Sequence, residues 1–335
     1  MHRFTLVRLP TAAEAAQRVA AAPQTRRFRA GGIDLIDHFK EGLDAPDELV
    51  ELRALGGAEG ERMRGITEHD GVWSVGALVT LAQLAEFGDF GPAFAAIREA
   101  AGSAATPGIR NAATLGGNLL QRPRCWYYRH ADLECLKKGG GQCFALTGDN
   151  RYHAVLGGGP SFIVHPSTLA VALLAHDARV HVVGPKGPRS LAVAELFSPP
   201  TVDPTREHTL AAGEIIVAIE LPAAGAQQRS SYAAAKEKQS HDWPLGEVAV
   251  RCRVEGGTLL DVRVALGHVA PIPWRAREAE AVLEGKAPSA ALFVQAADAA
   301  MAKAKPLDHN GYKIPLTKGL LRDALHRATG VAIPE

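Results

Sequence analysis

Two pairs of adjacent glycines are the residues of this sequence best suited to bind a charged ligand. The first pair lies within residues 30–35 (Ala-Gly-Gly-Ile-Asp-Leu), and the second lies within residues 114–120 (Thr-Leu-Gly-Gly-Asn-Leu-Leu). Glycine tolerates a positive φ and lets the backbone approach a ligand closely. A run of exposed backbone N–H groups in such a turn forms an anion-binding nest. Two nests in one chain therefore indicate one large ligand with a central diphosphate.

A group of three cysteines is the second chemical feature. Cys125, Cys135 and Cys143 follow the second glycine pair, whereas Cys252 lies far away in an apolar run. Four cysteines in 335 residues are too few for a disulfide scaffold. Cysteine thiolates are the usual ligands of iron–sulfur clusters. Together with the two nests, they make a flavin and an iron–sulfur centre the first hypothesis to test.

Length and charge limit the classes of partner. A chain of 335 residues predicts two or three domains. Its 37 Lys and Arg residues balance 36 Asp and Glu residues, so it lacks the basic excess that nucleic acids or anionic membranes attract. No apolar stretch reaches membrane-spanning length, and residues 1–7 show no secretory signal. We therefore expect no nucleic-acid partner, no membrane partner and a cytoplasmic location.

The elements that must position the glycines and cysteines fall into three units. Residues 1–56 predict a small α+β unit, in which a short strand at 28–30 leads into the first glycine pair. Residues 57–222 predict a second unit that contains the other glycine pair and a cysteine-bearing segment at about 121–160. Residues 228–335 predict a smaller α+β domain with a β-hairpin and the last helices.

Six motifs, taken in order, resemble the flavin-binding subunit of the molybdenum hydroxylases. This family includes xanthine dehydrogenase, carbon monoxide dehydrogenase and 4-hydroxybenzoyl-CoA reductase. The stretch at 118–127 is most similar to the flavin subunit of bacterial aldehyde oxidoreductases. The motifs span nearly the whole chain and lie at residues 30–35, 114–119, 165–167, 215–219, 242–245 and 312–316.

The resemblance implies both a fold and a function. The implied fold is α+β: a two-part FAD-binding region of the vanillyl-alcohol-oxidase-like type, followed by a smaller α+β C-terminal domain. The implied function is electron transfer, with substrate hydroxylation on a molybdenum-cofactor large subunit. A [2Fe–2S] small subunit would deliver the electrons, and the FAD of this chain would pass them to an external acceptor. The flavin supplies this chemistry, so we name no catalytic residue.

The implied FAD site consists of the two glycine loops and one lysine. Ile33 stands where the family usually has Thr, and Thr168 stands where relatives usually have Asp. Lys236 corresponds to a basic residue along the flavin, although a lone lysine is more often a solvated surface charge. The expected FAD-binding residues are Ala30, Gly31, Gly32, Ile33, Asp34, Leu35, Thr106, Gly108, Asn111, Thr114, Gly116, Gly117, Asn118 and Lys236.

The cysteine-bearing segment has a counterpart in relatives where four cysteines hold a [4Fe–4S] cluster. The resemblance therefore implies metal ligands at Cys125, Cys135, Cys143 and, in place of the fourth cysteine, Ser161. Three outcomes stay open: a cluster with Ser161 or His153 as fourth ligand, a three-iron form, or a segment that has lost its cluster. Zinc bound by three cysteines and a histidine is the rival metal. Because the sequence lacks a short Cys-x-x-Cys pair, zinc ranks below an iron–sulfur cluster.

Two other functions remain as alternatives. A scaffold subunit that has lost its cofactor would explain the departures at Ile33, Ser161 and Thr168. A stand-alone flavin oxidase would need no partner subunits. The sequence identifies neither the substrate of the complex nor its electron acceptor. Export to the periplasm with a partner subunit is the alternative to a cytoplasmic location.

Overall fold

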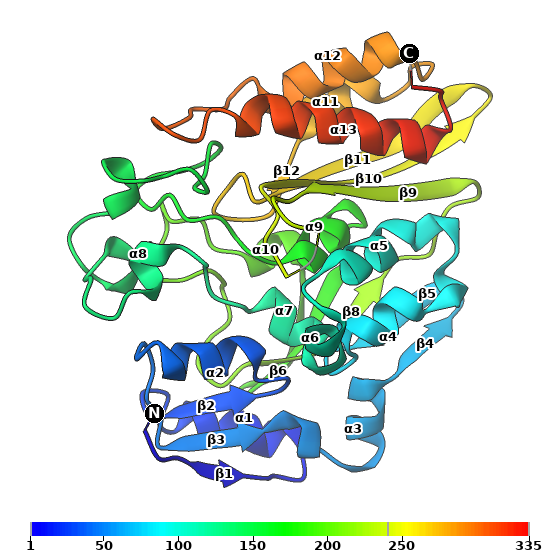
Figure 1. The fold of residues 1–335 in the computed structure, drawn as a ribbon. Helices are drawn as coiled ribbons and strands as arrows, with labels where there is room; N and C mark the ends of the chain where they lie inside the picture. Colours follow the sequence, from blue (N-terminus) through cyan, green and yellow to red (C-terminus); the bar gives the residue numbers. More distant parts are fainter. Residues whose placement is uncertain (1, 240, 334–335) are drawn as a thin grey trace.

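The computed structural model describes residues 2–239 and 241–333 of the chain. Three sheets follow one another along the molecule, with the N-terminal sheet at one end and the C-terminal domain at the other (Figure 1). Strands and helices occur in all three parts, so the predicted α+β fold class is confirmed. Within these residues, no helix is both long and apolar enough to cross a membrane.

The N-terminal unit is a three-stranded parallel sheet with helices packed against it. Its strands are β1 (Thr5–Val7), β2 (Arg26–Arg29) and β3 (Glu48–Glu51), in the order β1-β3-β2. Helix α1 (Ala12–Ala20) buries a stripe of alanines and Val19, and the Thr11 hydroxyl caps its first turn. Three residues separate β2 from helix α2 (Ile33–Lys40). The short connection between β2 and α2 is the first glycine loop.

The middle unit is a five-stranded antiparallel sheet with helices around it. The strand order is β4 (Ile66–His69), β5 (Val72–Gly76), β8 (Ile215–Leu221), β6 (Arg179–Gly184) and β7 (Gly187–Ala192). Helix α9 (Thr168–Ala175) is apolar on every side and fully buried, so it forms the centre of the largest core cluster. The other helices are α3 (Gly57–Arg64), α4 (Leu81–Glu86), α5 (Ala95–Ser103), α6 (Pro107–Ala112), α7 (Leu115–Leu119) and α10 (Val193–Leu196).

The cysteine-bearing segment has little regular structure. It contains the short helix α8 (Trp126–Arg129) and two 3₁₀ turns, Leu136–Lys138 and Phe144–Leu146. Ion pairs hold it in place: Glu207 binds both Lys137 and Arg122, with N–O distances of 2.9 Å in each pair. In Figure 1 the segment projects to one side of the middle unit.

The C-terminal domain is a four-stranded antiparallel sheet with helices on one face. The order is β12 (Trp274–Arg275), β11 (Thr258–Gly267), β10 (Gly246–Glu255) and β9 (Gln228–Ala235), and the predicted hairpin is confirmed by the pairing of β10 with β11. Helices α11 (Arg277–Leu283), α12 (Ala290–Met301) and α13 (Lys313–Thr329) share the core of one face. The other face packs on α5 and α9 of the middle unit. The sheet thus lies between its own helices and the middle unit.

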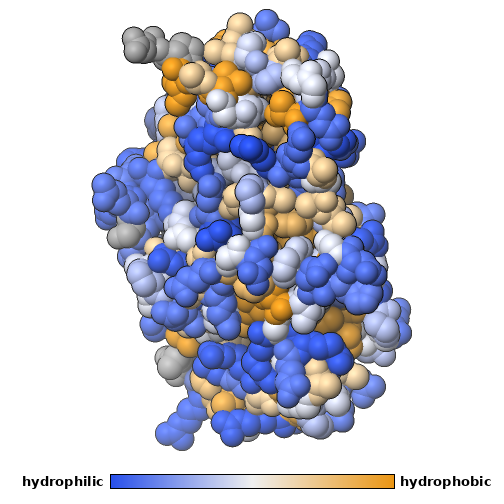
Figure 2. Space-filling view, turned by 90° about the vertical axis from the view of Figure 1, so that its right-hand side faces the viewer, coloured by the Kyte–Doolittle hydropathy of each residue, from blue (hydrophilic) through white to orange (hydrophobic). Residues whose placement is uncertain are grey.

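The surface carries both hydrophilic and hydrophobic side chains. In the space-filling view, hydrophilic residues cover most of the visible face, and hydrophobic residues show in smaller groups between them (Figure 2). Such a mixture is ordinary for the surface of a folded domain.

Candidate functional site

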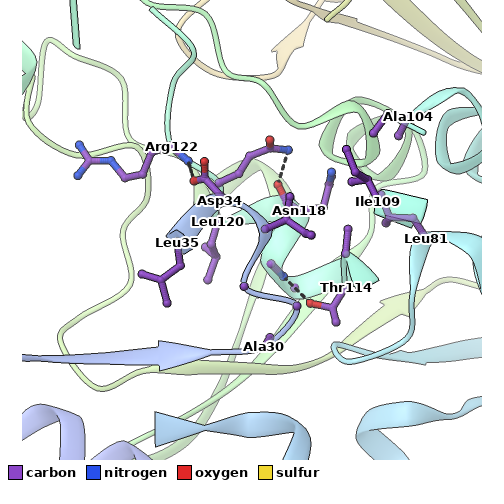
Figure 3. Close-up of a pocket in the computed structure, with 18 of the residues that line it drawn as sticks. Ala30, Asp34, Leu35, Leu81, Ala104, Ile109, Thr114, Asn118, Leu120 and Arg122 are labelled. Atoms are coloured by element: carbon purple, nitrogen blue, oxygen red, sulfur yellow. Dashed lines mark hydrogen bonds between the residues drawn. The ribbon is translucent and has the colours of Figure 1, made fainter. Parts of the chain in front are cut away.

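A cavity of about 420 Å³ lies where the three parts of the chain meet. The connection between β2 and α2 forms one wall and helix α7 forms the wall opposite. Figure 3 shows Ala30, Asp34 and Leu35 from the first loop near Thr114 and Asn118 from the second. Residues of the C-terminal domain, including Lys236 and Trp243, close one end. Its volume is within the range of small-molecule and cofactor sites.

The first glycine loop needs both of its glycines, for different reasons. A Cβ at Gly31 would lie 2.2 Å from the carbonyl oxygen of Ala112, so only glycine lets the two walls approach this closely. Gly32 has a φ of 74° and is the N-cap of α2, a left-handed conformation that favours glycine. The loop therefore turns sharply and packs directly on the C-terminal end of α6, just before the wall formed by α7.

The N-terminus of α2 opens into this cavity. No side chain caps the helix, and its first residues, Ile33 to Leu35, line the cavity. The first backbone N–H groups of a helix have no partner inside the helix, and the helix dipole places partial positive charge there. An anionic group is therefore stabilised at this end of α2. The first glycine pair predicted an anion nest at this position.

The second glycine loop is built differently from the expectation. The backbone N–H groups of Leu115 and Gly116 donate to the carbonyl oxygens of Val79 and Ala77, each at 2.9 Å. The N–H of Gly117 donates to the Thr114 hydroxyl at 3.2 Å. These amides already have partners, so the prediction of a second anion nest here is wrong. Instead, α7 is a rigid wall facing the nest.

The predicted FAD-binding residues fall into two groups. Three of them do not line the cavity: Thr106 caps α6 through the N–H of Ile109, and Gly108 and Asn111 lie within that helix. The residues that do line it are Ala30, Gly31, Gly32, Ile33, Asp34, Leu35, Thr114, Gly116, Gly117, Asn118 and Lys236.

Several lining residues were not expected from the sequence. Arg27, His38 and Asp44 flank the first loop without belonging to a motif, and Tyr128 comes from the cysteine-bearing segment. Only the tertiary fold brings them to the cavity. The Asp242–Trp243 pair, which belongs to one of the six motifs, does line the cavity.

Asp34 connects the first loop to the cysteine-bearing segment. One carboxylate oxygen lies 2.6 Å from Arg129 and 2.9 Å from Arg124, and the other accepts the backbone N–H of Arg122 at 2.7 Å. Burial raises the pKa of Asp34, but the two arginines and the N–H outweigh it, so the pKa is lowered overall. The carboxylate stays ionised, and its ion pairs join α2 to the cysteine-bearing segment.

The C-terminal end of the cavity combines aromatic and basic groups. The Arg124 guanidinium lies 4.4 Å from the centre of the Trp243 ring, a cation–π contact. The Lys236 ammonium donates to the carbonyl oxygen of Ser103. Burial lowers the pKa of Lys236. A second cavity of about 130 Å³ lies beyond Trp243 and shares that side chain as a wall.

The predicted metal ligands do not form a metal site. The Nε2 atom of His153 lies 3.2 Å from Cys125 Sγ, and Cys135 and Cys143 are near enough to influence that thiol. Burial raises the pKa of Cys125 to about 12, so its thiol is neutral. Ser161 is buried, but an alcohol is a poor fourth ligand. Across residues 2–239 and 241–333, no three His, Cys, Asp or Glu side chains converge to hold a metal ion, and three thiols with one alcohol make a poor ligand set for a cluster.

The chain matches known families along nearly its whole length. A model described as "FAD binding domain in molybdopterin dehydrogenase" matches residues 2–224, and one described as "CO dehydrogenase flavoprotein C-terminal domain" matches residues 230–328. The chain is 35% identical over 335 residues to the aldehyde oxidoreductase FAD-binding subunit PaoB of Escherichia coli K12, covering 99% of this chain and 100% of PaoB.

Two further comparisons concern carbon monoxide dehydrogenase. The medium chain of the Hydrogenophaga pseudoflava enzyme is 26% identical over 306 residues, which cover 90% of this chain and 88% of that relative. A solved structure of carbon monoxide dehydrogenase from the same organism superimposes with a TM-score of 0.76 over 98% of both chains, at 26% identity. These matches confirm the prediction of an oxidoreductase flavoprotein subunit with FAD as its cofactor. The chain belongs to the FAD-binding medium subunits of the molybdenum hydroxylase family.

Proposed function

We propose that the cavity between the two glycine loops holds the FAD. The diphosphate would lie at the N-terminus of α2, against the backbone of Gly32 and the first residues of the helix. The isoalloxazine would lie at the other end, near Lys236 and Trp243. The observation that carries this proposal is the uncapped N-terminus of α2, which opens into a cavity of cofactor size. The Gly31 backbone, packed directly on Ala112 at the end of α6, would keep the nest in position.

We further propose that the chain relays electrons inside a complex. A molybdenum-cofactor large subunit would oxidise an aldehyde, and a [2Fe–2S] small subunit would pass the electrons to this chain. The similarity to PaoB, named as the FAD-binding subunit of an aldehyde oxidoreductase, supports this assignment. When bound, the flavin supplies the redox chemistry. The residues of the chain bind and orient it, and no step is assigned to the cysteine-bearing segment.

Co-purification from the native host tests the assembly. A tag on the full chain should recover a molybdenum subunit and a [2Fe–2S] subunit with the flavin. Recovery of a monomer that oxidises aldehydes without either partner would contradict the proposal. Fractionation of the same cells tests the compartment, for which we propose the cytoplasm. The four cysteines, all unpaired, suit a reducing compartment.

A further inference from the structure

A fully buried carboxyl group lies on the face of the C-terminal sheet that is turned toward the middle unit. Glu247, near the start of β10, is 0% exposed. In the sheet it pairs with Ala234 of β9 and Gly267 of β11. A Cβ at Gly267 would lie 2.2 Å from Glu247 Oε1, so this glycine makes the room for the side chain. The fold accommodates a carboxyl group where an apolar side chain is the usual choice.

The hydrogen bonding of Glu247 is incomplete. The Tyr232 hydroxyl donates to Oε2 at 2.5 Å, whereas Oε1 has no hydrogen-bond partner. The Nε2 atom of His268, also without a hydrogen-bond partner, lies 3.8 Å from Oε1. Burial raises the pKa of Glu247 to about 7, although Tyr232 and Lys236 oppose the increase. A buried polar atom without a partner is costly, so the unpaired oxygen requires an explanation.

Two side chains connect Glu247 to the proposed flavin cavity. Thr168 lines the cavity, and its side chain also faces the Tyr232 hydroxyl. Lys236 lines the same cavity, and its positive charge acts on Glu247. Hydroxyl groups can pass a proton along a chain of hydrogen bonds, because each one is both a donor and an acceptor. Thr168 and Tyr232 thus lie between the cavity and the carboxyl group, and both side chains are hydroxyl groups.

Charged groups on the surrounding helices are already paired. On α13, the Lys313 ammonium donates to the backbone carbonyl oxygens of His268 and Tyr152. On α5, a Glu99 oxygen accepts the backbone N–H of Tyr232 and an Arg327 guanidinium N–H. Neither Lys313 nor Glu99 lines the cavity, whereas Lys236 does, and its positive charge acts on Glu247.

We propose that Glu247 takes up a proton when the flavin in this cavity is reduced. This inference rests on the proposed function, in which the partner subunits deliver the two electrons. Reduction to the anionic form takes one proton to the flavin and adds one negative charge to the cavity. The Glu247 carboxylate gains a second proton from solvent through Thr168 and Tyr232 and becomes neutral. Lys236 then balances the charge of the reduced cofactor in place of the carboxylate, so the buried site stays electrically neutral.

The pH dependence of the flavin potential tests this inference directly, because its slope counts the protons taken up with the electrons. At pH 8, where the Glu247 carboxyl group is largely ionised before reduction, we expect about two protons per two electrons in the wild-type full chain and about one in Glu247→Gln. At pH 6 the two proteins should agree, because Glu247 is already neutral there. The control Glu278→Gln removes a surface carboxylate of the same domain and should behave as wild type.

A second variant and a spectroscopic measurement cover the case in which Glu247→Gln does not fold. Tyr232→Phe removes the hydroxyl that stabilises the carboxylate, so the range of two-proton uptake should move to higher pH. In wild type at pH 8, infrared difference spectra should show a neutral carboxyl group appearing on reduction. Absence of that band, or equal proton uptake by Glu247→Gln and wild type, would overturn this inference while the flavin assignment stands. A full chain that purifies without flavin would instead overturn the proposed function first.

Discussion

Gly31 and Gly108 both belong to the expected FAD site, but their surroundings differ. An added Cβ at Gly31 would meet the Ala112 carbonyl oxygen at 2.2 Å, whereas a Cβ at Gly108 would meet no atom within 4 Å. We expect Gly31→Ala to push the two walls apart and to weaken FAD binding at least about tenfold, a cost of about 1.4 kcal/mol. Titration of the apoprotein with FAD measures the effect.

Gly108→Ala is the matched control for this prediction. It adds the same methyl group in a helix, where alanine is the better helix former, and should leave FAD affinity unchanged. Unchanged FAD affinity in Gly31→Ala, or equal losses in both variants, would show that the cavity does not hold the flavin.

Asp34 is expected to matter for stability as well as for the site. Asp34→Asn leaves Arg124 and Arg129 without their buried partner, and we expect it to lower the free energy of unfolding by about 2 kcal/mol at pH 7. Asp37→Asn is the control, because that carboxylate is more exposed, lies 3.8 Å from Arg124 and should contribute under about 0.5 kcal/mol.

The pH dependence of the Asp34 contribution has a definite sign. The folded-state pKa of Asp34 is lowered, so its contribution is complete above the ordinary carboxyl pKa of about 3.9. It disappears as the pH falls through the lower folded-state value. Urea unfolding at several pH values should therefore show wild type and Asp34→Asn converging in acid. A constant difference across that range would contradict the role of the ion pairs.

At the scale of elements, features formed by neighbouring residues could be predicted from the sequence. The hydrogen-bond partners of individual backbone N–H groups could not. The β10–β11 hairpin follows from two apolar strands around a Gly-Gly turn, and the structure has it. The first glycine loop is also local, since a strand and a helix directly flank it. The second loop failed as a nest because its amides bond to Ala77 and Val79, which lie about forty residues earlier. No local pattern reveals such partners.

The cysteine-bearing segment gives a prediction at the same scale. Three thiols and one alcohol make a poor ligand set, so wild-type protein prepared without oxygen should contain less than one cluster equivalent of iron. Ser161→Cys supplies a fourth thiol and should raise the iron and sulfide content and its stability in air. Ser198→Cys is the control, because it adds a thiol at another buried serine outside the segment.

Iron analysis decides between the outcomes for this segment. No iron in either wild type or Ser161→Cys would mean that the segment is purely structural. Full, air-stable occupancy in wild type would contradict the interpretation of Ser161 and would require another residue, such as His153, to complete the ligand set.

At the scale of the whole molecule, the cavity depends on all three parts of the chain. The N-terminal unit supplies the uncapped N-terminus of α2, the middle unit supplies the opposite wall, and the C-terminal domain supplies Lys236 and Trp243. The six sequence motifs come from all of these parts, so the family could be identified before the fold was known. The contribution of Arg27, His38 and Asp44 could not be predicted, since only tertiary packing brings them to the site.

The central claim is that electrons from the molybdenum subunit pass through the flavin of this chain. The most direct test follows flavin absorbance in the assembled complex after an aldehyde is added without oxygen or another acceptor. The flavin should bleach at a rate no slower than turnover, and the Gly31→Ala complex should lose this bleaching together with acceptor reduction. Full turnover with an acceptor while the flavin stays oxidised, or undiminished turnover in a flavin-free Gly31→Ala complex, would contradict the claim.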